Sequence, residues 1–100
     1  MTNADFQQRL EEMYKNFPYN IMDKPSKTLN ELCYALRMDK EYDYNLSIFN
    51  SILNQWLCVP SVKECFIPVK TLARHVKEVK VDEDDDFECP EVCLMIIVED

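Results

Sequence analysis

Glycine is absent from all 100 residues of the chain, although it makes up about 7% of an average protein. Phosphate-binding P-loops, dinucleotide-binding turns, nucleophile elbows and EF-hand calcium loops each need glycine where the backbone turns tightly or approaches a ligand. The chain therefore carries none of these motifs. Tight hairpins with primed turns are also disfavoured, so we expect helices joined by links that contain proline and asparagine.

Residues 43–58 form the stretch around which we expect the rest of the chain to fold. Their large apolar side chains recur at the i, i+3, i+4, i+7 spacing of one helix face, at Leu46, Phe49, Ile52, Leu53, Trp56 and Leu57. Burying one such side chain contributes roughly 1.5–3 kcal/mol. A segment that carries six of them sets the packing of its neighbours, and we predict that it is the central helix.

Two more helices are predicted before this segment. Residues 3–17 carry an apolar stripe that Pro18 ends, because the residue before a proline avoids helical backbone angles. Thr28 and Glu31 have the spacing of a capping box, in which each side chain satisfies the other residue's free backbone N–H. This pair predicts a second helix that runs to Met38.

A fourth amphipathic helix is predicted after Pro68, which can occupy a first helical position. The positions that define it are Val69, Leu72, Ala73, Val76 and either Val79 or Lys80. The opposite side is basic, with Lys70, Arg74 and Lys77 at i, i+4, i+7 spacing. So few bases form a small electrostatic footprint for a nucleic acid, and we do not expect nucleic acid to be the partner.

The formal charge of −8 is concentrated near the C-terminus. Nine of the 19 acids lie within residues 82–100, which hold no Lys or Arg and leave ten acids against 11 bases in the first 81 residues. We therefore divide the chain into a helical domain, residues 1–81, and an acidic link with a hydrophobic terminal segment, residues 82–100. The acidic run is interpreted as a solvated linker, or as a screen over the basic side of the fourth helix.

The terminal segment contains seven consecutive apolar residues, Val92 to Val98. Its β-branched residues favour a strand buried on both faces, and a strand needs a partner for its backbone groups. Three outcomes remain open at this stage. The run pairs with residues 64–67 of its own chain, it pairs in a dimer or adds to a partner's sheet edge, or it forms a short buried helix.

The five cysteines, at positions 33, 58, 65, 89 and 93, are an odd number, and the N-terminus lacks a secretory signal. This pattern favours reduced thiols over a disulfide framework. A zinc site is an alternative, with Cys58, Cys65, His75, Cys89 and Cys93 as candidate ligands of a zinc-stabilised nucleic-acid-binding protein. Only Cys89 and Cys93 have the spacing of a zinc knuckle, so we predict no bound metal.

The second predicted helix offers a further alternative. Thr28, Leu29, Cys33 and Leu36 resemble a BC-box, the short helix by which SOCS-box-type substrate receptors dock onto the elongin B/C adaptor of cullin ubiquitin ligases. Arg37 stands where that motif has an aliphatic residue, with Leu36 one place early. The resemblance implies an adaptor whose Leu29, Cys33 and Leu36 side chains point into elongin C.

The sequence thus predicts a mainly α fold, a small four-helix domain followed by a C-terminal β-strand or extended segment after the acidic link. We expect a cytoplasmic or nuclear protein without a membrane span, since no run of 18 apolar residues exists. One histidine, and no Ser or Cys in a recognisable nucleophile setting, favour a non-enzymatic role without a cofactor. The predicted role is protein–protein interaction, as a complex subunit or regulatory protein, and a homodimer is one form it could take. The predicted contacts are Val92, Leu94, Ile96, Ile97 and Val98.

Overall fold

The computed structural model describes residues 1–64, 66–82 and 91–99. Within these ranges the chain is a small α/β domain in which three helices accompany a four-stranded mixed sheet. In chain order the elements are α1 (Asn3–Lys15), α2 (Leu29–Arg37), β1 (Asp43–Asn50), β2 (Gln55–Val59), α3 (Val69–Leu72), β3 (His75–Val81) and β4 (Glu91–Glu99). The mainly α prediction was therefore wrong.

The central helix predicted for residues 43–58 is a β-hairpin made of β1 and β2, with Phe49 opposite Trp56 and Ile48 opposite Leu57. The segment satisfies two periods at once, because Tyr44, Leu46 and Ile48 also alternate with polar residues as a half-buried strand does. The turn needs a left-handed residue, and Asn54 supplies it with a φ of 51°. Glycine was therefore not required for this hairpin.

The predicted fourth helix was also wrong for most of its length. Only Val69–Leu72 is helical, and the chain continues into β3 from His75. Lys70 lies on the short helix, Arg74 in the link that follows it and Lys77 on β3, so these bases do not share a helix face. Three of the seven residues of β3 are β-branched valines, which favour a strand.

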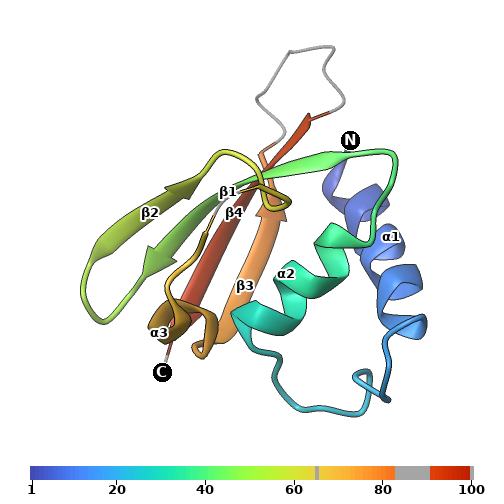
Figure 1. Cartoon of the computed structure of the whole chain (residues 1–100), viewed down its shortest axis with the longest axis horizontal. Helices are drawn as coiled ribbons and strands as arrows, with labels where there is room; N and C mark the ends of the chain where they lie inside the picture. The colour runs from blue at the N-terminus through green and yellow to red at the C-terminus, as the bar shows by residue number, and fades with distance from the viewer. Residues whose placement is uncertain (65, 83–90, 100) are drawn as a thin grey trace.

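The terminal apolar run is a strand, and it lies inside the sheet. The strand order is β2-β1-β4-β3, with β4 parallel to β1 and antiparallel to β3. Figure 1 shows β4, in red, between β1 and β3. Its ladder partners are therefore residues 43–50 and 75–81 rather than residues 64–67. Residues 91–99 belong to the same sheet as strands from the first 81 residues, whereas most of the acidic link, residues 83–90, lies outside the described residues.

Two of the helix predictions were confirmed. Helix α1 spans Asn3–Lys15, with Thr2 as the N-cap, and helix α2 begins at the predicted capping box of Thr28 and Glu31. The two helices lie together on one side of the sheet (Figure 1). Their buried residues and the inward residues of the strands form one core, which includes Phe6, Leu10, Leu32, Leu36, Tyr44, Leu46, Ile48, Leu94, Ile96 and Val98.

A candidate protein-binding face

The side of the sheet that faces away from the core carries large apolar side chains. Strand residues alternate between the two faces of a sheet, and the inward set of β1 is Tyr44, Leu46 and Ile48. Phe49 belongs to the opposite set, and its neighbours across the ladders are Trp56 on β2 and Ile97 on β4. The next row of the same face places Met95 opposite Ser47. We call Phe49, Trp56, Met95 and Ile97 the outer apolar face.

These side chains line a hollow of about 200 Å³, which Glu78 and Lys80 of β3 border. The rings of Phe49 and Trp56 pack with their centroids 5.0 Å apart and their planes tilted by 41°. Lys80 Nζ lies 2.9 Å from Glu78 Oε1, so the two charged side chains at the rim form an ion pair with each other. The floor of the hollow is apolar and its rim on one side is polar.

The outer apolar face is substantially open to solvent. Trp56 is 56% exposed and Met95 is 44% exposed, although both lie on a sheet whose other face is buried by helices. Scattered exposed apolar residues are ordinary, but a contiguous patch with an aromatic anchor is typical of a contact surface. Aromatic residues and methionine are also the types enriched in protein interfaces.

The structure places the five predicted contacts of the terminal segment on two faces. Val92, Leu94, Ile96 and Val98 are buried against the helices, at 6% exposure or less. Ile97 is half-buried and lines the outer hollow. In this fold the four inward residues stabilise the core of the chain itself. The outward face of the same strand, Met95 and Ile97, is the part that a partner can reach.

The three residues of the BC-box resemblance, Leu29, Cys33 and Leu36, are all fully buried within the core. Burial raises the pKa of the Cys33 thiol to about 11, as expected for a thiol that is held neutral in apolar surroundings. A helix that presented these side chains to an elongin C groove would first have to leave the sheet on which it packs. Their arrangement is that of core residues.

The candidate zinc ligands do not come together within the part of the chain that the structure describes. No group of three or more His, Cys, Asp or Glu side chains in these residues could hold a metal ion. Cys65 and Cys89 lie outside the described residues. His75 Nδ1 is 2.9 Å from the Ser26 hydroxyl, and Cys58 is an exposed free thiol on β2.

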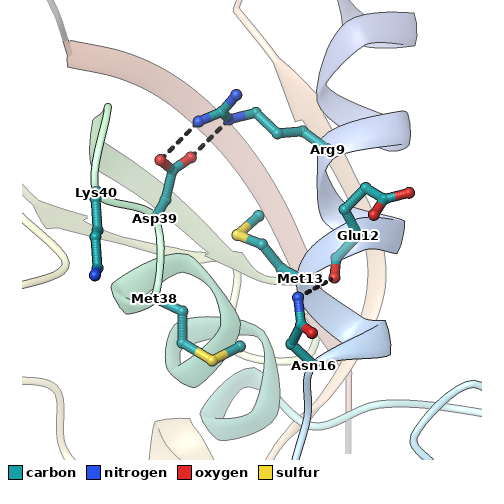
Figure 2. Close-up of a pocket in the computed structure, with 7 residues that line it drawn as sticks. All are labelled: Arg9, Glu12, Met13, Asn16, Met38, Asp39 and Lys40. Atoms are coloured by element: carbon teal, nitrogen blue, oxygen red, sulfur yellow. Dashed lines mark hydrogen bonds and ion pairs between the residues drawn. The ribbon is translucent and has the colours of Figure 1, made fainter.

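A second, more polar cleft of about 330 Å³ lies between α1 and the end of α2 (Figure 2). Its most buried polar group is Asp39. The carboxylate accepts hydrogen bonds from the Arg9 guanidinium, the Tyr44 hydroxyl and the backbone N–H groups of Glu41 and Tyr42. Burial acts to raise the pKa of Asp39, but these donors outweigh it and hold the pKa well below the ordinary value. The Asp39 carboxylate thus connects α1, the end of α2 and β1.

Glu31 is the other carboxylate with a strong set of internal partners. Lys24 Nζ lies 2.8 Å from Glu31 Oε2, the Thr28 N–H donates to Oε1, and the Tyr19 hydroxyl donates to Oε2. Burial opposes ionisation here too, but Lys24, Thr28 and Tyr19 together lower the pKa to about 2. This cluster holds the start of α2 against the preceding loop. The lowered pKa of Glu31 is therefore explained by contacts that stabilise the fold.

No protein-family model matches the chain, and searches among curated proteins and solved structures found no significant match. Among the described residues, none of the helices is both long and apolar enough to span a bilayer.

The sequence prediction did not include Phe49, Trp56 or Met95 as contact residues. The helix predicted for residues 43–58 places Phe49 and Trp56 on its buried side, and the predicted terminal strand includes Met95 only as part of a run buried on both faces. The signal that could have found them is the polar alternation of Asn45 and Ser47 with the inward residues of β1. Extending that alternation places Phe49 on the polar, outward side, where a large aromatic residue is unusual.

Proposed function

We propose that this chain is a non-enzymatic protein-interaction module that binds a protein partner through the outer apolar face of its sheet. The C-terminal segment contributes to this surface through Met95 and Ile97, and the hairpin contributes Phe49 and Trp56. The observation that carries the proposal is the exposure of Trp56 and Met95 on a sheet whose opposite face packs against the helices.

The size of the hollow favours a protein side chain over a small-molecule substrate. Ligand pockets usually enclose about 300–1,000 Å³ and bury most of the ligand, whereas this hollow encloses only about 200 Å³. One large aliphatic or aromatic side chain of a partner fits such a space. Tryptophan at the border of a pocket is a common binding hot spot, because it buries much area for little conformational entropy.

The charges of the rim suggest how the partner is oriented. Glu78 and Lys80 are neighbours on β3 and form an ion pair beside the apolar floor. If an apolar side chain of the partner occupies the hollow beside Trp56, the polar groups next to that side chain in the partner come close to the Glu78–Lys80 ion pair. Rim charges of this kind affect the association rate and the orientation of a complex more than its affinity.

The non-enzymatic part of the proposal is supported by the role of the two carboxylates with strongly shifted pKa values, which is to hold the fold together. Asp39 and Glu31 are the groups whose pKa values are lowered most clearly, and perturbed carboxylates often mark active sites. Here each one is saturated by donors from its own fold. Their shifts are accounted for by the ion pairs that stabilise the domain.

The proposal is tested by site-specific photo-crosslinking in cells that express the chain. A photoreactive amino acid replaces Met95 in one variant and Met22 in a control variant. The control is closely matched, because Met22 is 45% exposed and Met95 is 44% exposed, but Met22 lies in the loop between α1 and α2. We expect a discrete protein adduct from position 95 and not from position 22. Equal adducts from both positions, or none from position 95, would contradict the proposal.

A further inference from the structure

The two edges of the sheet are finished in different ways. At the β3 edge, the Gln7 side chain donates to Val79 O, the Val81 N–H donates to Asn3 Oδ1, and the Val76 N–H donates to Lys27 O. The edge also carries charged side chains at Lys77, Glu78 and Lys80. Charges and covered backbone groups are the usual protection of an edge strand against pairing with another chain.

Among the described residues, the β2 edge has neither form of protection. Its sequence from Gln55 to Val59 contains no charged residue and no proline, and in the sheet it pairs with β1 alone. Within the described part of the chain, no hydrogen bond connects the backbone of Trp56 or Cys58 to a group outside the sheet. An uncharged, unprotected edge of this kind is able to accept another strand.

The hydrogen bonds around β1 show which backbone groups of β2 point outward. The Ser51 N–H donates to Val98 O on the β4 side, and Tyr44 O accepts from the Val62 N–H on the other side. Even-numbered residues of β1 therefore face β2, and their ladder partners are the odd-numbered residues of β2. By the alternation of an antiparallel ladder, the N–H and C=O groups of Trp56 and Cys58 point away from the sheet.

From this edge we propose that β2 pairs antiparallel with β2 of a second copy of this chain, to form a symmetric dimer with a continuous eight-stranded sheet. The two-fold axis passes beside Leu57, which lies opposite Leu57 of the other copy. Trp56 of each copy lies opposite Cys58 of the other, and these are the residues with outward backbone groups. The proposal concerns the edge of the sheet and does not depend on the function proposed for its outer face.

The register follows from the residues that flank β2. Centring the pair on Leu57 gives two hydrogen-bonded residue pairs, whereas centring it on Cys58 would place Trp56 opposite Pro60, which has no N–H. Centring it on Trp56 would place Cys58 opposite Asn54, which the left-handed turn holds out of strand geometry. Because β2 itself carries no charge, no like charges oppose each other across the pair, although the whole chain carries a net charge of −8.

This arrangement favours a second copy over an unrelated strand because it joins the apolar residues of the two outer faces. On each copy the outward row runs from Ile97 through Phe49 to Trp56. Across the junction Trp56 meets Cys58 of the other copy, whose own row continues to Ser47 and Met95. The exposed Trp56 then packs on both sides instead of one. Aromatic cross-strand contacts of this kind stabilise strand pairing.

The oligomeric state is tested by sedimentation velocity of the full chain in reducing buffer, over a dilution series from micromolar to millimolar. We expect a monomer–dimer equilibrium that Cys58→Pro abolishes. Proline is tolerated at an edge position whose N–H points to solvent, so this variant keeps its fold, which circular dichroism checks. Cys58→Ser retains the backbone donor and should still dimerise. A wild-type chain that stays monomeric over the whole series would overturn the proposal, as would a dimer that survives Cys58→Pro.

The register is tested by disulfide trapping in a Cys58→Ser background. Leu57→Cys should form an intermolecular disulfide on oxidation, because directly opposed residues in a non-hydrogen-bonded pair lie about 4.5 Å apart between Cα atoms. Gln55→Cys is the matched control, since two copies of position 55 would be about 13 Å apart along the strands. Mass spectrometry of the linked peptides identifies the bond. Trapping at position 55 instead of position 57 would contradict the register. If photo-crosslinking at position 95 finds no partner, the result of disulfide trapping is unaffected. The two proposals can therefore fail separately.

Discussion

Arg9 and Asp39 meet at two points, with Arg9 Nε 2.7 Å from Asp39 Oδ2 and Arg9 Nη2 2.8 Å from Asp39 Oδ1. Arg9 comes from the middle of α1, whereas Asp39 follows the end of α2. The Tyr44 hydroxyl donates a third hydrogen bond, 2.6 Å from Asp39 Oδ2, and Tyr44 is the second residue of β1. One buried carboxylate therefore connects both helices to the strand that begins the hairpin.

Removing the negative charge of this carboxylate should destabilise the domain. In Asp39→Asn, Arg9 loses its buried ionic partner, and the amide nitrogen replaces an oxygen that accepts at least two hydrogen bonds, so we expect a loss of about 3 kcal/mol. The measurement is the free energy of unfolding in urea. Glu41→Gln is the control, because Glu41 lies 3.5 Å from Arg9 but is largely exposed, and its loss should cost less than about 1 kcal/mol. Equal losses in the two variants would contradict the assigned role of Asp39.

The same carboxylates predict how stability depends on pH. The pKa of Asp39 is held well below its ordinary value, and that of Glu31 is about 2. A carboxylate with a depressed pKa contributes stability that is fully present above its unfolded-state pKa of about 4 and is lost as the pH falls toward the folded-state pKa. We therefore expect the urea midpoint to fall between about pH 5 and pH 2. Asp39→Asn should flatten this dependence, and an unchanged slope in that variant would contradict the assignment.

The caps of the two longer helices should differ in importance. Thr28 takes part in a reciprocal capping box and also contacts Glu31 through its hydroxyl, whereas Thr2 makes a single bond to the Asp5 N–H at an exposed end. Thr28→Ala should cost about 1–2 kcal/mol, and Thr2→Ala should cost about 0.5 kcal/mol. Thermal denaturation followed by circular dichroism measures both. The opposite order would show that α2 does not rely on the capping box.

Neighbouring isoleucines on β4 provide a test of which face of this strand is buried. Ile96 is fully buried against the helices, and Ile97 lines the outer hollow. Ile96→Ala should cost about 3–4 kcal/mol because it leaves a cavity in the core, whereas Ile97→Ala should cost about 1 kcal/mol. Urea unfolding of the two variants gives the comparison. A larger loss at position 97 would mean that the strand lies with its faces exchanged.

The local signals of the helices could be read from the sequence because they depend on neighbouring residues. The Thr28–Glu31 capping box and the apolar stripe of Phe6, Leu10 and Met13 act within one or two turns. These signals located α1 and α2 within a few residues. The β-branched side chains of residues 92–98 also favour a strand, although the sequence alone allows a short buried helix as well.

The sheet could not be read in this way because its pairing is long-range. Residues 46, 49, 53, 56 and 57 fit a helical period, but the hairpin is stabilised by the insertion of β4, which begins 41 residues after the end of β1. The hairpin turn also carried no glycine signal, because Asn54 provides the left-handed residue. The outer apolar face was missed for the same reason, since Phe49, Trp56 and Met95 become neighbours only through two strand registers.

The most direct test of the outer apolar face is a binding measurement with the partner that photo-crosslinking at position 95 identifies. Isothermal titration calorimetry compares the wild-type chain with Met95→Lys and Met22→Lys. The first variant places a charge on the apolar floor and should weaken binding by about 30-fold, which corresponds to about 2 kcal/mol for a hot-spot contact. Met22→Lys should leave the affinity unchanged. Full affinity in Met95→Lys, with its fold intact by circular dichroism, would contradict the proposed binding face.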